Sequence, residues 1–168
     1  WYSTNPRWQQ QWFDRIKELV DDGRLGKLYY YDSVRVNLGL FQHDVNVLWD
    51  LAVHDLSIMD YLLRCNPLAI TAMGASHAGN NLANIAYLTL TFPNNLLAHF
   101  HVNWLAPVKL RTTLIGGSKK MIVYDDVEAT EKVRLYDKGF IVNGTPEKQY
   151  QALINYRIGD VLIPKLDA

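Results

Sequence analysis

An aspartate and a histidine lie four residues apart in the segment NVLWDLAVHDLSIMDYLL, residues 46 to 63. The spacing of its apolar residues predicts a helix on which Asp50 and His54 share a narrow polar stripe opposite a wide apolar face. Histidine exchanges protons near neutral pH, and a carboxylate one turn away can fix its tautomer and stabilise its charged form. The pair can therefore perform acid–base chemistry; the alternative is an ion pair on the helix surface.

A second carboxylate of this segment, Asp55, falls inside the apolar face of the predicted helix. Burial of a carboxylate is costly unless it is paired or hydrogen-bonded. We therefore predict that Asp55 is a structural anchor, bonded to an arginine or to loop amides, rather than a catalytic group.

Two polar residues, Arg35 and Asn37, end a predicted strand over residues 27–38, close to the loop that leads into this helix. Such side chains can bind a substrate hydroxyl or phosphate. The alternative is that both are solvent-exposed strand residues.

His99 and His101 alternate on a predicted strand, so both imidazoles point to the same side and can reach one ion. No cysteine or further histidine lies nearby in the sequence. We therefore favour polar groups on a sheet face, and we expect no metal site.

The elements that must position these residues are helices first and strands afterwards. A helix is predicted over residues 6–22, followed by the strand over 27–38 and the helix over 46–63. Alternating apolar runs predict further strands at 68–77, 84–92, 96–104, 108–116, 120–126, 132–137 and 157–164. Short turns between consecutive strands indicate an antiparallel meander. The expected fold is α+β, an open, largely antiparallel sheet with helices packed on one face.

The opposite sheet face is expected to be mixed. Alternation assigns Tyr87, His101 and Arg111 to this face, and Leu110 and Leu114 to the core. A face of polar atoms on apolar stems suits a subunit interface or a wet active-site wall.

Composition excludes several classes of protein. The chain has 168 residues, 49% of them hydrophobic, and a formal net charge of zero, which indicates one globular domain without a nucleic-acid or anionic-membrane partner. No apolar run reaches the roughly 20 residues of a membrane span. The single Cys65 cannot form an internal disulfide, which predicts a cytoplasmic location.

Three segments in this order resemble the C-terminal domain of the Gfo/Idh/MocA oxidoreductases, and the resemblance covers nearly the whole chain. NVLWDLAVHDLSIMDYLL resembles the helix with their Asp-x-x-x-His motif, PRWQQQWFDRIKELVDDGRLGKLYYYDSVRVN the preceding helix and strand, and TTLIGGSKKMIVYDD a later hairpin. The resemblance implies a glyceraldehyde-3-phosphate-dehydrogenase-like C-terminal fold. Asp50 and His54 match the motif, in which the histidine moves the proton of a sugar hydroxyl during hydride transfer and the aspartate orients it or contacts the substrate.

Members of this family bind NAD or NADP in an N-terminal Rossmann domain. Neither a Gly-x-Gly-x-x-Gly fingerprint nor the family's Glu-Lys-Pro motif occurs here. Residues 1–168 are therefore expected to be a single substrate-binding and oligomerisation domain, truncated at both ends and inactive alone. Ala52 stands where the family often has glycine, and Trp49 is bulky, so the shape of the site is expected to differ.

The resemblance implies a parent NAD(P)-dependent dehydrogenase that acts on a sugar, cyclitol or nucleotide-sugar hydroxyl. It also implies a homodimer or homotetramer formed through the open sheet face. The alternative is a non-catalytic oligomerisation module that uses this face, with Asp50 and His54 in a structural role.

Overall fold

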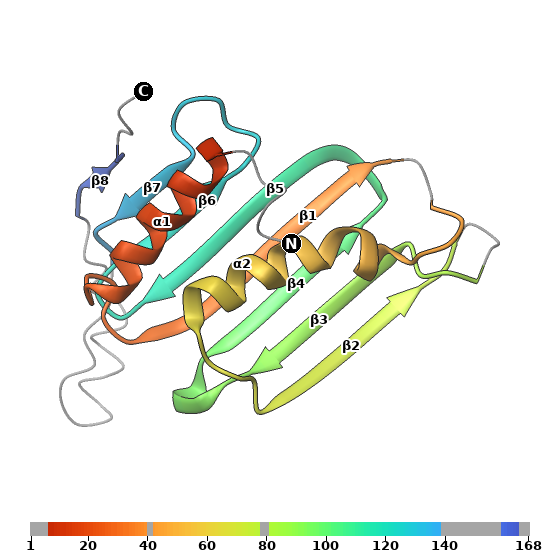
Figure 1. Cartoon of the computed structure of the whole chain (residues 1–168), viewed down its shortest axis with the longest axis horizontal. Coiled ribbons are helices and arrows are strands. Elements are labelled where there is room, and N and C mark those ends of the chain that lie inside the picture. The colour runs from red at the N-terminus through yellow and green to blue at the C-terminus, as the bar shows by residue number, and fades with distance from the viewer. Residues whose placement is uncertain (1–6, 40–41, 78–80, 139–158, 165–168) are drawn as a thin grey trace, which may run out of the picture.

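The computed structural model describes residues 7–39, 42–77, 81–138 and 159–164. Within these ranges the chain forms one eight-stranded sheet with two α-helices on the same face, as Figure 1 shows. The predicted α+β fold with helices on one face of an open, largely antiparallel sheet is confirmed. None of the helices in the described ranges has the length and apolar character needed to cross a membrane.

The elements lie close to the positions that the sequence predicts. In chain order they are α1 (Arg7–Asp21), β1 (Leu28–Leu38), a π-helical turn η2 (Leu48–Ala52), α2 (Val53–Leu63), β2 (Ala69–Ala75), β3 (Ile85–Thr91), a 3-10 turn η3 (Pro93–Asn95), β4 (Leu97–Asn103), β5 (Leu105–Gly117), β6 (Met121–Asp125), β7 (Val133–Tyr136) and β8 (Val161–Leu162).

The strand order is β2-β3-β4-β1-β5-β6-β7-β8, so the predicted meander is wrong at one point. β4 and β5 follow each other in the chain, but β1 lies between them, parallel to β4 and antiparallel to β5. All other neighbouring strands are antiparallel. A short connection shows that two strands are close together, but it does not show whether an earlier strand is inserted between them.

The core lies between the helices and the sheet. It contains Phe13, Ile16 and Leu19 from α1, Met59 and Leu62 from α2, and Tyr31, Ala98, Phe100, Ile115 and Ile122 from the strands. A smaller cluster packs the start of the second helical segment on β3 and β4 through Val47, Ala52, Ala86, Val102 and Trp104. Apolar burial at both ends therefore fixes this segment on the sheet.

The predicted faces of β5 are reversed. Ile115 is 1% exposed and lies in the core, whereas Leu110 and Leu114 are 45% and 37% exposed. Arg111 has the same alternation as Ile115, so it lies on the helix side of the sheet. Each of the two sets of alternate residues in β5 contains both polar and apolar side chains. Only the pairing of β5 with β1 therefore decides which set faces the helices.

An ion pair joins α2 to β1. The Arg35 guanidinium donates from Nε to Asp55 Oδ2 at 2.9 Å and from Nη2 to Asp55 Oδ1 at 2.7 Å. The two side chains are 12% and 5% exposed. Of the two kinds of partner predicted for Asp55, an arginine or loop amides, the structure shows the arginine.

The first helix is attached to the same assembly by two contacts. The ring of Phe13 packs edge-on against Tyr124 of β6, with centroids 5.4 Å apart. The Tyr61 hydroxyl of α2 donates to Asp14 Oδ1 of α1 at 2.7 Å. The two helices therefore keep a fixed separation above the sheet.

We expect Asp55→Ala to destabilise the fold by about 3–5 kcal/mol, because it leaves the Arg35 charge buried without its partner. Urea unfolding measures this change. The matched control is Glu18→Ala, which removes an exposed ion pair with Arg15 and should cost less than about 1 kcal/mol. The double variant Arg35→Met/Asp55→Leu should regain most of the loss. An Asp55→Ala effect as small as that of Glu18→Ala would contradict the assignment.

Candidate functional site

A cavity of about 310 Å³ lies where the two helices meet the sheet. It is lined by Phe13 from α1, Arg35 from β1, Asp50 and Leu51 from η2, His54 and Ile58 from α2, and Arg111 from β5. Four of these seven side chains are ionisable. This volume is at the lower end of small-molecule sites, which corresponds to a ligand of about monosaccharide size.

Asp50 occupies a helical turn that the sequence pattern does not predict. Residues 48–52 form a π-helical turn before α2 begins at Val53. Asn46 Oδ1 accepts hydrogen bonds from the backbone N–H groups of Leu48 and Trp49 at 3.1 and 3.2 Å, which satisfies the start of the turn. A π-helical turn has more residues per turn than an α-helix, so it changes the angle about the helix axis between Asp50 and the residues after it. The single regular α-helix predicted over residues 46–63 is therefore wrong at this turn.

A tryptophan holds the Asp50 carboxylate. Trp104, which is 2% exposed and follows β4, donates from Nε1 to Asp50 Oδ2 at 2.9 Å. The sequence alone did not identify Trp104 as a partner of Asp50. A buried indole N–H usually needs an acceptor, and this need is the signal that would have pointed to a nearby carboxylate.

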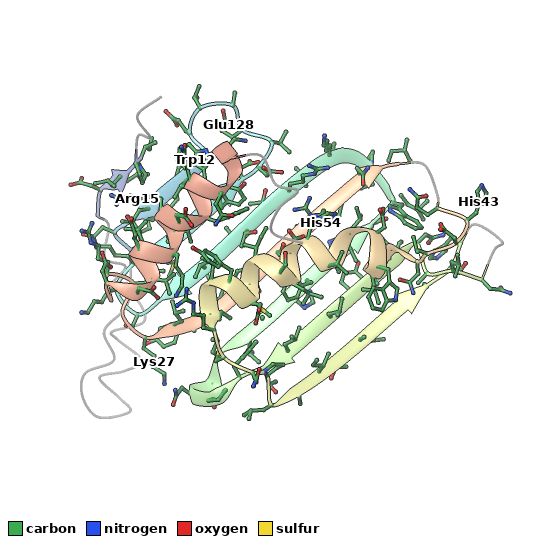
Figure 2. The ribbon with its side chains drawn as sticks, in the orientation of Figure 1. Trp12, Arg15, Lys27, His43, His54 and Glu128 are labelled. Atoms are coloured by element: carbon green, nitrogen blue, oxygen red, sulfur yellow. The ribbon has the colours of Figure 1, made fainter. Side chains whose placement is uncertain are left out.

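His54 lies on the edge of α2 that is directed toward β5 (Figure 2), where it lines the cavity. Loss of solvent around the ring, and then the nearby Arg35 guanidinium, lower the pKa of His54 below its usual range. Asp55 and Asp50 act in the opposite direction, and Arg111 lowers the pKa further. The neutral imidazole, which can accept a proton, is therefore favoured at neutral pH.

The structure brings Arg35, Asp50 and His54 together, but it places Asn37 elsewhere. Arg35 lines the cavity while its fork is bonded to Asp55, so it is not the solvent-exposed strand residue of the alternative prediction. Asn37 is half-buried near the end of β1, and it is not among the residues that line the cavity.

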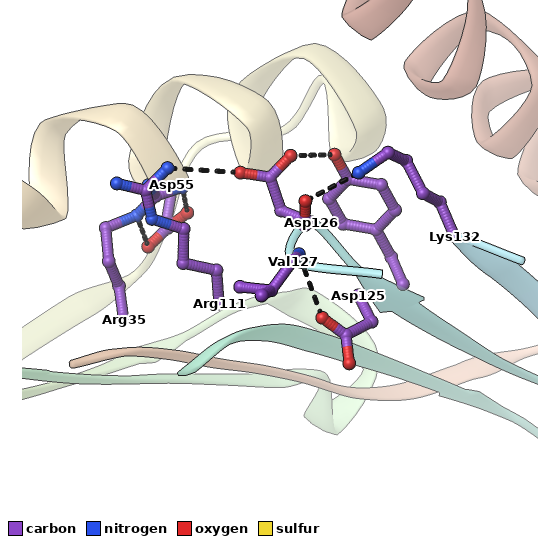
Figure 3. A network of polar contacts seen from close by, with 8 residues as sticks. Arg35, Asp55, Arg111, Asp125, Asp126, Val127 and Lys132 are labelled. Carbon is purple, nitrogen blue, oxygen red and sulfur yellow. Dashed lines mark hydrogen bonds and ion pairs between the residues drawn. The ribbon is translucent and has the colours of Figure 1, made fainter. Parts of the chain in front are cut away.

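Arg111 is a cavity residue that sequence reasoning placed on the wrong face. It lies directly opposite Arg35 in the β1–β5 pair, so two guanidinium groups are neighbours under α2 (Figure 3). Arg111 Nη1 is 3.4 Å from Asp126 Oδ2. The same carboxylate accepts from the Tyr124 hydroxyl at 3.0 Å, and the Asp126 carbonyl accepts from Lys132 Nζ at 2.6 Å.

His99 and His101 lie on the sheet face away from the cavity. His99 Nδ1 is 3.0 Å from Thr89 Oγ1, and the His101 ring stacks on Tyr87 with centroids 4.6 Å apart. In the part of the chain that the structure describes, no group of three or more His, Cys, Asp or Glu side chains is arranged to hold a metal ion. The expected lack of a metal site stays a prediction.

Comparison with known proteins identifies the family of this domain. The model of the GFO/IDH/MocA C-terminal domain matches residues 13–123. No curated protein sequence matches the chain.

Solved structures share the fold at low sequence identity. UDP-N-acetylglucosamine 3-dehydrogenase GnnA from Acidithiobacillus ferrooxidans has a TM-score of 0.61 and 20% identity, over 73% of this chain and 42% of that chain. The WlbA dehydrogenase from Bordetella pertussis, in complex with NADH and UDP-GlcNAcA, has a TM-score of 0.62 and 15% identity, over 71% and 40%. Levoglucosan dehydrogenase in complex with NADH has a TM-score of 0.64 and 14% identity, over 73% and 39%. The chain thus spans about two fifths of the length of each of these structures.

Two charge-removing variants should move the pKa of His54 in opposite directions. Asp50→Asn removes an anion that raises this pKa, so the pKa should fall; Arg111→Met removes a cation that lowers it, so the pKa should rise. A pH titration of the imidazole resonances by NMR measures both shifts. The resonance of His43, in a loop away from the cavity, serves as the internal control. Shifts in the same direction, or none, would contradict the described electrostatics.

Proposed function

The chain belongs to the GFO/IDH/MocA family as its C-terminal domain, and on that premise we propose that it is the substrate domain of an NAD(P)-dependent oxidoreductase. The proposed substrate is a sugar, cyclitol or nucleotide-sugar, oxidised or reduced at one hydroxyl carbon. The observation that carries the proposal is one cavity of monosaccharide size in which Asp50, His54, Arg35 and Arg111 meet. The dehydrogenases named above support the same class of reaction.

His54 is the proposed proton acceptor. Its lowered pKa keeps the imidazole neutral at neutral pH, so a ring nitrogen can take the proton of a substrate hydroxyl. The nearby Asp50 and Asp55 carboxylates then stabilise the imidazolium that forms. In the reverse direction the same nitrogen returns the proton to the alkoxide oxygen as the carbonyl is reduced.

Asp50 is the proposed orienting group. Its hydrogen bond from buried Trp104 fixes one carboxylate oxygen, and the second oxygen can accept a hydrogen bond from the imidazole or a substrate hydroxyl. Arg35 is held by Asp55 and supplies a fixed positive charge at the cavity wall.

NAD or NADP supplies the hydride acceptor or donor when it is bound. The described residues do not provide a dinucleotide cradle, because Gly116 and Gly117 end β5 and lead into β6 rather than into a helix N-terminus. We propose that a separate N-terminal domain of the parent protein binds the nucleotide, and that this chain binds the substrate and moves its proton.

The parent protein tests this assignment. With NAD or NADP and a panel of sugars, cyclitols and nucleotide sugars, His54→Ala should lower kcat by about 10²–10⁴-fold, because the general base is lost. Asp50→Asn should give a smaller loss. Nicotinamide absorbance measures turnover, and thermal melting checks the fold.

The matched control is His43→Ala, which removes a histidine away from the cavity and should leave kcat unchanged. Full turnover in a folded His54→Ala variant would refute the catalytic role.

The open sheet face supports a second function, self-association. Large apolar side chains are exposed on the face that both helices leave uncovered: Met73, Tyr87, Leu97, Leu110 and Leu114. A row of this kind on a sheet face marks a protein contact surface. We propose that a second copy of this chain packs against it, as an addition to the catalytic role or as the alternative to it.

We expect Leu110→Glu to dissociate the assembly, because it places a charge in the centre of an apolar contact. Light scattering after size exclusion measures the mass of the parent protein. The matched control is Ile70→Glu, since Ile70 is also exposed but lies on the other face of the sheet. A wild-type monomer, or equal masses of wild type and Leu110→Glu, would exclude this interface.

A further inference from the structure

We propose that Arg111 selects an anionic substrate. Its guanidinium binds a carboxylate or phosphate group of a monosaccharide whose hydroxyl faces His54 and Asp50. This inference rests on the proposed function for its setting, and it adds the chemical class of the substrate. It starts from a difference between the two arginines that line the cavity.

The Nε and Nη2 side of Arg35 is occupied by Asp55. Its Nε and Nη2 groups form the bidentate pair with Asp55, and the side chain is only 12% exposed. A second anion could be bound by this fork only if the ion pair that attaches α2 to β1 were broken. Arg35 therefore contributes a charge to the cavity, but not its donor pair.

Arg111 has donors to offer. Within the described residues, its side chain forms one hydrogen-bonded ion pair, from Nη1 to Asp126 Oδ2 at 3.4 Å. Hydrogen bonds between an arginine and a carboxylate are usually about 2.7–2.9 Å long, and a guanidinium has five N–H donors. The Arg111 side chain is 35% exposed, and it lines the cavity.

The partner of Arg111 is shared and buried. The Asp126 side chain is 6% exposed, and its carboxylate also accepts the Tyr124 hydroxyl. The Lys132 ammonium lies beside it, bonded to the Asp126 carbonyl. This network (Figure 3) holds Arg111 through one Nη group, and the side chain stays 35% exposed.

Arg35 on β1 and Arg111 on β5 each have a carboxylate partner, Asp55 and Asp126 respectively. The Arg111 contact with Asp126 is 3.4 Å long, against 2.7 Å for Arg35 with Asp55, so Asp126 offsets the Arg111 charge less. An anion bound at Arg111 would also lie beside the second guanidinium, that of Arg35.

The cavity is polarised across its floor. Asp50 is bonded to Trp104 at the end of β4, whereas Arg111 lies on β5, and β1 separates these two strands. A ligand that is anionic at one end and neutral at the other fits this arrangement. Its anionic group binds at Arg111, and its hydroxyl end lies at Asp50 and His54. A bidentate guanidinium suits the planar carboxylate and the tetrahedral phosphate equally.

The test measures binding in the cofactor-loaded parent protein by calorimetry, with D-glucuronate, glucose 6-phosphate and glucose as probes. We expect at least one anion to bind about tenfold or more tightly than glucose, and Arg111→Met to remove this preference. Arg111→Lys keeps the charge but loses the fork, so it should retain only part of the preference. Tighter binding of D-glucuronate would identify the anion as a carboxylate, and tighter binding of glucose 6-phosphate would identify it as a phosphate.

The matched control is Arg24→Met, which removes an exposed arginine from a surface ion pair and should keep the preference for the anion. If Arg111→Met fails to fold, as judged by its melting temperature, the Arg111→Lys result decides. Anions that bind no more tightly than glucose to the wild type, or a preference that survives in the folded Arg111 variants, would overturn the proposal.

His54→Ala separates this inference from the proposed function. It should lower kcat by about 10²–10⁴-fold and keep the anion preference. Anion binding that depends on Arg111 in a protein without His54-dependent turnover would refute the dehydrogenase assignment but not the anion site. His54-dependent turnover of neutral sugars without an anion preference would refute the anion site alone.

Discussion

The rest of the structure depends on the ion pair between Arg35 and Asp55. It is bidentate and largely removed from solvent, and it joins the middle of the sheet to the helix that carries His54. A pair of this kind adds less net stability than apolar packing would, but an unpaired charge in its place is very costly. It therefore acts mainly as a constraint: α2 can lie on the sheet only in the position that brings the two charges together. That position also sets the distance of His54 from the cavity floor.

The remaining cavity residues are fixed by similar local requirements. The buried Trp104 indole needs an acceptor, and Asp50 provides one from a π-helical turn. Arg111 lies directly opposite Arg35 on the neighbouring strand, so the two positive charges repel each other. The Asp126 carboxylate beside Arg111 reduces this repulsion. The site is thus built from charges that each have a structural partner, with Arg111 and His54 directed into the cavity. Each side chain that lines the cavity comes from a helix or a strand.

The two faces of the sheet differ in what they carry. The helix side holds the cavity and the core, and the opposite side presents exposed apolar residues together with the stacked Tyr87 and His101 rings. Since successive strand residues alternate between the two faces, each central strand contributes side chains to both faces. A change on one face can therefore be tested with little disturbance of the other, provided that the alternation of each strand is known.

The sequence by itself determined the element types, the open α+β sheet, and the anchoring role of Asp55, because periodicity and the cost of a buried charge are local properties. It also placed Asp50 and His54 on one helical segment. Only the tertiary structure decided that β1 lies between β4 and β5, and that Arg111 rather than Leu110 faces the helices. The physical reason is that strand pairing joins residues far apart in the chain, and a strand whose two alternations both mix polar and apolar residues has no preferred face until its partner supplies one.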